Sequence, residues 1–264
     1  MSADLGLPDG PLIPAPAASP APRRVLAQAR FDATVMLRNG EQVLLTLVLP
    51  LLLLVGLART GVIRLGVGTD PAARIAVVAP GVLALAVMST AFTGQAIGTG
   101  FDRRNGVLRL LGTTPLGRSG LLAGRVLAVL VVETVQLAVL LPAALLLGWH
   151  PQPGGLLPAL LAIGLGTAAF VALGLLLAGT VRAEAVLAGA NLAWVLLLAG
   201  GGVVIPPERL GPMAGLARAL PSGALGDALR SALTDGVWPP GPIVVLLGWS
   251  IVAGLAAARW FRWD

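Results

Sequence analysis

The chain has 264 residues and a formal net charge of +6, with 56% hydrophobic and only 11% charged residues. Soluble domains carry about 25% charged residues, so this composition and a mean hydropathy of +0.90 exclude a water-soluble fold and indicate an integral membrane protein. All 18 basic residues are arginine, which excludes a P-loop, and the absence of cysteine with a single histidine excludes thiolate and multi-histidine metal sites.

The N-terminal region divides into two parts. Residues 1–22 contain six prolines and no sustained apolar run, so we predict a disordered tail. Residues 23–39 follow a helical period, with most apolar side chains on one face and with Phe31 and Val35 outside it. This pattern predicts an amphipathic helix in the membrane interface. The apolar face consists of Val25, Leu26, Ala29, Ala33, Met36 and Leu37.

Six apolar segments follow, each close to the roughly 20 residues that a helix needs to cross a bilayer. We therefore predict an all-α integral membrane protein in which residues 40–264 form a six-helix transmembrane domain, preceded by the interfacial helix. The connection over residues 205–238 is rich in leucine and balanced in charge, which predicts an outer re-entrant loop. The predicted spans are 42–58, 75–97, 121–147, 156–181, 185–204 and 243–260.

The arginines between the spans predict the orientation, because cytoplasmic loops are enriched in basic residues. With the N-terminus inside, twelve arginines lie on the cytoplasmic side and six outside, which places both termini in the cytoplasm. These charges sit at the ends of spans, where membrane lipids attract them, so we expect no nucleic-acid partner. The six outer arginines are Arg59, Arg64, Arg74, Arg209, Arg218 and Arg230.

The connection between the second and third spans, residues 102–118, is the segment most suggestive of function. Leu108, Leu110 and Leu111 lie at helical spacing among arginines, and Gly112 and Pro115 then end the helix. A short basic helix held by a rigid turn could dock in a groove of a cytosolic partner. The alternative is an ordinary basic loop that follows the positive-inside rule.

Polar side chains inside the predicted spans are few. Glu133 and Gln136 lie one turn apart in the third span, and Asn191 lies in the fifth. An ionised carboxylate at that depth costs about 2.5–3.5 kcal/mol, so such groups usually face protein or water. Glu133 could line a transport path, attract cations or carry a proton. We favour the alternative, in which Glu133 and Gln136 hold helices together and Asn191 makes an interhelical hydrogen bond.

The segment from residue 102 has a distinctive order of features: an acidic-basic pair, a glycine, spaced leucines, a Thr-Pro-Leu turn, an arginine and a Gly-Arg pair. This order resembles the loop after the second helix of ABC-2-type transporter permeases, although Val107 and Arg104 depart from the usual residues. Pro50 and Ile205-Pro206 similarly resemble that family's first span and last outer loop. The matching residues are Asp102, Arg103, Gly106, Leu108, Leu111, Thr114, Pro115, Leu116, Arg118, Gly124 and Arg125.

The resemblance implies a half-transporter that moves substrate outward by alternating access. Two six-helix permeases would pair, and each would rest on a separate cytosolic ABC ATPase that binds ATP and Mg²⁺. The chain itself would then be non-catalytic and bind no cofactor, and its cargo class would be drugs, as in multidrug efflux, lipids or glycans. Together with the Arg-, Ala- and Gly-rich composition, this implies a multi-pass protein of a bacterial cell membrane. The implied coupling residues are Arg103, Arg104, Gly106, Leu108, Arg109, Leu111, Thr114, Pro115, Leu116 and Arg118.

Three other functions compete with the exporter. A secondary transporter driven by an ion gradient could use Glu133, although residues 40–147 and 156–260 show no convincing repeat of the kind that such proteins often contain. A membrane-embedded enzyme would need paired acids, histidine clusters or metal-ligand spacings in the spans, and the sequence has none. A purely structural membrane subunit is the third alternative.

Overall fold

The structure is a computed structural model that describes residues 18–60 and 70–262. Within those ranges all regular secondary structure is helical, which confirms the all-α fold class. The first 17 residues of the predicted tail and Arg64 lie outside the described residues. The prediction of six spans is confirmed, because six stretches are long and apolar enough to cross a membrane: Gly40–Arg59, Pro71–Arg104, Gly117–Leu146, Pro153–Thr180, Ala183–Gly201 and Pro240–Trp260.

The helix boundaries follow local capping chemistry. The Asn39 side chain accepts a hydrogen bond from the Gln42 backbone N–H at 3.2 Å, which begins the first span. Asp70 likewise caps the second span, just before Pro71. The elements are α1 (Ala21–Arg38), α2 (Gly40–Arg59), α3 (Pro71–Met88), the π-helical η1 (Ser89–Gly94), α4 (Gln95–Arg104), α5 (Val107–Gly112), α6 (Gly117–Leu146), η2 (Pro153–Gly155), α7 (Leu156–Thr180), α8 (Ala183–Gly201), η3 (Pro207–Met213), α9 (Ala214–Ala219), α10 (Pro221–Leu233) and α11 (Pro240–Trp260).

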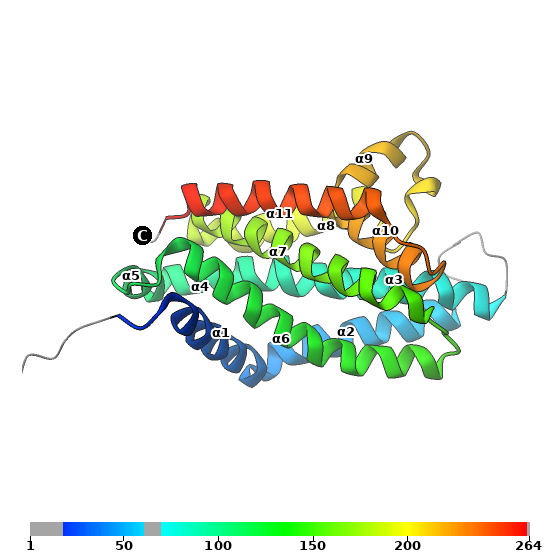
Figure 1. Cartoon of the computed structure of the whole chain (residues 1–264), viewed down its shortest axis with the longest axis horizontal. Coiled ribbons are helices and arrows are strands. Elements are labelled where there is room, and N and C mark those ends of the chain that lie inside the picture. Colours follow the sequence, from blue (N-terminus) through cyan, green and yellow to red (C-terminus); the bar gives the residue numbers. More distant parts are fainter. Residues whose placement is uncertain (1–17, 61–69, 263–264) are drawn as a thin grey trace, which may run out of the picture.

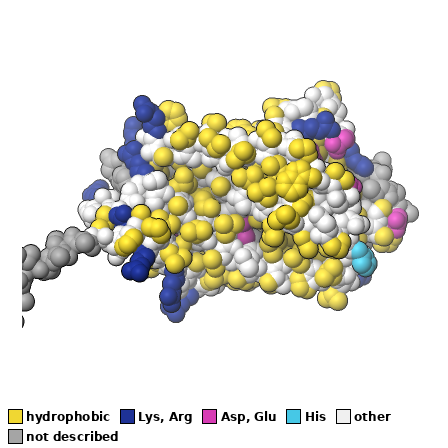
Figure 2. Space-filling model, viewed as in Figure 1, with side chains coloured by type: hydrophobic (Ala, Val, Ile, Leu, Met, Phe, Trp, Pro, Cys, Tyr) yellow, Lys and Arg dark blue, Asp and Glu magenta, His cyan; other side chains and the backbone are white. Residues whose placement is uncertain are grey.

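The long helices run side by side along the longest axis of the molecule (Figure 1). The short helix α5 and the end of α11 lie at one end of this bundle, and α9 and α10 lie toward the other. Hydrophobic side chains cover the middle of the visible face, while charged side chains gather toward the two ends (Figure 2). This distribution is that of a multi-pass membrane protein, whose apolar band faces lipid.

The core is built around α3 and α7. Every residue from Val78 to Met88 is buried, and α7 packs against α3, α4, α10 and α11. Small residues allow this close approach, as is typical of helix packing in membranes. At Gly174 of α7, an added Cβ would lie 2.8 Å from the Phe92 carbonyl oxygen and 3.2 Å from the Ala96 nitrogen. The π-helical turn η1 is therefore packed directly against the backbone of α7.

Helix α1 has apolar residues on two faces. One face, which includes Ala29, Ala33 and Met36, is buried, and α1 packs mainly on α6. Leu26, although predicted on that same face, is 65% exposed, and Phe31 is 63% exposed. The helix therefore packs on its own bundle along a narrow stripe and keeps other apolar side chains at the surface. Its location in a membrane interface stays a prediction.

Gly174→Val tests the packing of η1 against α7. The added side chain meets backbone atoms, which cannot move aside as a side chain can, so we expect a loss of about 1–3 kcal/mol of unfolding free energy. Gly164→Val is the matched control, since Gly164 lies on the same helix with nothing within 4 Å of an added Cβ. Thermal unfolding of the detergent-solubilised proteins should show a lower midpoint for Gly174→Val alone, and equal midpoints would contradict the packing described.

Candidate functional site

The short helix α5 packs on the bundle with one side and is exposed on the other. It begins after Gly106, whose φ of 75° is a left-handed conformation that favours glycine. Leu108 is fully buried in the core of the bundle, whereas Leu110 is 69% exposed. Val107 and Arg109 are also exposed. Leu108 therefore fixes the helix to its own chain, and the surface that α5 presents consists of Val107, Arg109 and Leu110.

Two of the predicted coupling arginines bind the ends of other spans. The Arg103 guanidinium donates to the carbonyl oxygens of Ala178 at 3.2 Å and Val181 at 2.8 Å, at the C-terminal end of α7. Arg118 donates to the Arg259 carbonyl at 3.0 Å, at the end of α11. A cation placed at the last carbonyls of a helix also interacts favourably with the helix dipole. These two side chains thus tie the segment around α5 to α7 and α11.

The remaining predicted coupling residues lie at the surface or at its edge. Leu111 and Leu116 are half-buried, whereas Arg104, Thr114 and Pro115 are exposed. The Pro115 carbonyl accepts a hydrogen bond from the Arg24 guanidinium of α1, so the turn after α5 contacts α1 directly.

A buried ion cluster lies behind α5. The Arg125 guanidinium of α6 pairs with Asp32 of α1, with its Nε 3.3 Å from Oδ2, and with Asp102 of α4. The Asp32 side chain is only 5% exposed. Burial raises the pKa of the Asp32 carboxyl above its ordinary value, although the positive charge of Arg125 and a hydrogen bond from Gln28 oppose this rise. One guanidinium thus joins the three helices that surround the α5 segment.

Glycines let α1 approach α6 closely enough for this cluster to form. A Cβ added at Gly124 would lie 3.0 Å from Gln28 Cγ and 3.5 Å from the Val25 carbonyl oxygen. At Gly120, one turn earlier, an added Cβ would lie 3.8 Å from the Val25 side chain. The Gly-Arg pair at 124–125 therefore combines the close approach and the cation at adjacent positions.

The polar residues predicted inside the spans separate into two groups. Glu133 and Gln136 are buried within the bundle. The Thr167 hydroxyl of α7 donates to Glu133 Oε2 at 2.6 Å, and Gln136 Nε2 donates to the Thr46 carbonyl of α2 at 2.5 Å. Asn191 is exposed on the surface of α8. The structure thus places Glu133 and Gln136 in contacts between helices and does not bring Asn191 to them.

The sequence reasoning missed Asp32. The sequence does place Asp32 on the same face of α1 as Ala29, Ala33 and Met36. A carboxylate on a buried face needs a cation as its partner, and this could have pointed to the ion cluster. No cluster of three or more His, Asp or Glu side chains with the geometry for a metal ion occurs in residues 18–60 and 70–262.

These features agree with a comparison against protein families. The model of the ABC-2 type transporter family matches residues 24–234. The chain belongs to this family. It is therefore the membrane permease component of an ABC transporter, and ABC-2 permeases normally work with ABC ATPase subunits. A comparison with curated proteins gave no match.

Replacing Arg125 should loosen the region that surrounds α5. Arg125→Gln leaves Asp32 buried without its cation, and breaking a buried ion pair costs roughly 3–5 kcal/mol of unfolding free energy. We expect a value at the lower end of this range because Asp102 is partly exposed. Limited tryptic cleavage at the exposed Arg30 should become faster as α1 detaches. Arg182→Gln, at an exposed arginine with no side-chain partner among the described residues, is the control. Unchanged stability and cleavage in Arg125→Gln would contradict this role.

Proposed function

We propose that this permease is the membrane subunit of an ATP-driven exporter, and that α5 is the coupling helix that receives movement from a separate ATPase. The observation that carries the proposal is the construction of α5. Leu108 fixes it to the bundle, while Val107, Arg109 and Leu110 form an exposed basic and apolar surface at one end of the molecule. Such a surface suits a groove on a cytosolic partner.

The contacts around α5 provide a route for that movement into the spans. The segment continues from α4 and leads into α6, and Arg125 joins both helices to α1. Arg103 extends the connection to the end of α7, and Arg118 extends it to the end of α11. A displacement of α5 by the ATPase would therefore reach five helices at once. Alternating access requires such a concerted displacement.

The orientation of the chain supports a cytosolic position for the ATPase. The positive-inside rule assigns the α5 end to the cytoplasm, where the ATPase would bind ATP and Mg²⁺. The permease contributes no P-loop, because it contains no lysine. The source membrane would be the cytoplasmic membrane of a bacterium, and the cargo would be a drug, a lipid or a glycan.

The surface of the spans supports assembly with a second permease, identical or related. Most residues of α2 and α8 are not buried by the bundle, and α8 carries Asn191 outward. Intramembrane polar groups usually face protein or water rather than lipid. A second permease packed on the exposed surface of α8 would shield Asn191 and place it beside a path between the two subunits.

Charging the exposed face of α5 should abolish ATPase binding. The double variant Val107→Asp/Leu110→Asp places two carboxylates on the surface that faces the partner, and we expect loss of copurification with the ATPase while membrane insertion persists. Leu216→Asp is the control, because Leu216 is a similarly exposed leucine on the short helix α9 toward the other end. Copurification should be measured by affinity isolation in mild detergent with identification of bound subunits by mass spectrometry. Normal copurification of the double variant would reject α5 as the coupling helix.

Gradient-driven transport through Glu133 is the second candidate, and one observation favours it. Glu133 Oε1 has no hydrogen-bond partner among the described residues, so the carboxyl retains an unused polar atom in the bundle. If Glu133 instead serves the contact with Thr167, Glu133→Gln preserves that contact, since an amide oxygen also accepts a hydrogen bond.

We expect export by Glu133→Gln to persist from mildly acidic to mildly alkaline pH and to cease when the partner ATPase is inactivated. Cargo accumulation in inverted membrane vesicles, with ATP supplied or with a proton gradient alone, measures both. Transport by the wild type that needs the proton gradient but no ATP, and that Glu133→Gln abolishes, would establish the second candidate.

A further inference from the structure

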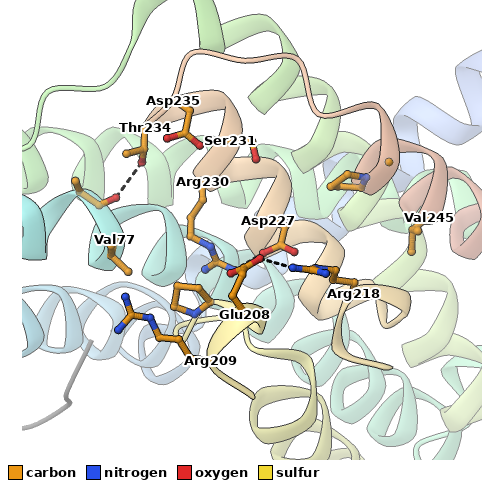
Figure 3. Close-up of a pocket in the computed structure, with 14 residues that line it drawn as sticks. Val77, Glu208, Arg209, Arg218, Asp227, Arg230, Ser231, Thr234, Asp235 and Val245 are labelled. Atoms are coloured by element: carbon orange, nitrogen blue, oxygen red, sulfur yellow. Dashed lines mark hydrogen bonds and ion pairs between the residues drawn. The ribbon is translucent and has the colours of Figure 1, made fainter. Parts of the chain in front are cut away.

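A large pocket lies toward the end of the bundle opposite α5. It has a volume of about 720 Å³ and is lined by the start of α3, the η3 segment, α9, α10 and the start of α11 (Figure 3). Small-molecule sites usually range over about 300–1,000 Å³, so this pocket could hold a ligand of moderate size.

Most charges that line the pocket are already paired. Arg230 Nη2 lies 2.7 Å from Asp227 Oδ1, and the same guanidinium donates to the carbonyls of Val203 at 2.8 Å and Gly202 at 3.2 Å. Burial raises the pKa of the Asp227 carboxyl. These contacts connect α10 to the end of α8, and we assign Arg230 and Asp227 a structural role.

A second ion pair lies at the mouth of the pocket. Arg218 Nη2 lies 2.7 Å from Glu208 Oε1, and both side chains are more than half exposed. The hydrogen bond from Arg218 lowers the pKa of the Glu208 carboxyl, so this residue stays ionised. Neither member of the pair is therefore left with an uncompensated charge.

Two charges remain without a partner. Arg209 of η3 and Asp235, just after α10, line the pocket and are exposed, and within the part of the chain that the structure describes neither side chain makes a hydrogen bond or ion pair. Figure 3 shows them on opposite sides of Arg230, with Asp235 at the top of the view and Arg209 at the bottom. The pocket therefore offers one available cation and one available anion at separate positions.

The surroundings of the pocket suggest lipid as the source of its ligand. Val77, Val245 and Pro242 give it apolar walls. Trp238, in the connection that leads into α11, is 50% exposed, and exposed tryptophans are typical of the headgroup level of a membrane. Further along α11, Val244 and other large apolar side chains are exposed, so acyl chains could lie against this helix.

We propose that this pocket binds a phosphate–ammonium zwitterion, and specifically the headgroup of a phospholipid such as phosphatidylethanolamine, with the phosphate at Arg209 and the ammonium at Asp235. The acyl chains lie along the exposed face of α11. A purely anionic lipid satisfies only Arg209, so the pocket distinguishes lipids by their ammonium group. The inference does not depend on ATPase coupling, because none of these residues belongs to the α5 segment.

The test uses the full-length protein in detergent and acyl-labelled phosphatidylethanolamine or phosphatidylglycerol with identical chains. We expect the wild type to bind phosphatidylethanolamine roughly five- to tenfold more tightly, as one charge-assisted contact allows. Arg209→Gln should weaken both lipids by a similar factor, whereas Asp235→Asn should weaken phosphatidylethanolamine alone and remove the preference. Arg59→Gln and Glu184→Gln, at exposed charges outside the pocket, should change neither affinity.

Three other results would overturn the proposal in whole or in part. Equal binding of the two lipids by the wild type would overturn the proposal whether or not any variant folds. A preference that survives Asp235→Asn, or an unchanged affinity of Arg209→Gln for both lipids, would overturn the assignment to this pocket. Water-soluble glycerophosphoethanolamine is the competitor that separates the sources. Displacement of the lipid by this compound at equal concentration would overturn the lipid source, and weak displacement would support it.

Discussion

The arrangement at the α5 end depends on the guanidinium of Arg125. It neutralises Asp32 of α1 and Asp102 of α4 together, so α1, α4 and α6 share one ion cluster. A buried carboxylate is tolerated only when it is paired, and α1 must therefore keep its polar stripe against α6. Gly124 makes this possible, because a larger residue would hold α1 away. The position of α1 against α6 therefore depends on this cluster, and so does the contact of α1 with the turn after α5.

Arginine has a second structural use in this lysine-free chain. Arg103 binds the last carbonyls of α7, Arg118 those of α11, and Arg230 the carbonyls just past the end of α8. Helix ends leave carbonyl oxygens without intrahelical donors, and a planar guanidinium can reach two of them at once. A lysine ammonium would satisfy this geometry less well. The arginines at the ends of the spans thus satisfy the free carbonyl oxygens of neighbouring helices, in addition to setting the orientation of the chain.

The six spans could be predicted from sequence because each is a long apolar run, and the loop around α5 could be located because its glycines, leucines and proline form an ordered pattern. The direction of each side chain could not be predicted. Leu108 and Leu110 have the same chemistry, yet one is buried and the other exposed, and only the packing of α5 on the bundle decides which. The π-helical turn η1 was also missed, and it packs against Gly174 of α7, a contact between residues far apart in sequence. Asp32 was missed for the same reason, because its partners lie on α4 and α6.

The buried polar side chains limit where a transport path can run. Gln136 bonds to α2 and Glu133 to α7, so both serve contacts within one bundle, and moving them to solvent would break those contacts. The Asn191 side chain makes no such contact among the described residues and is exposed on α8. A polar side chain directed toward lipid is unfavourable, whereas the same side chain at a subunit boundary can bond to protein, water or cargo. The proposed path is therefore better supported at the outer face of α8, between two permeases, than through the interior of one.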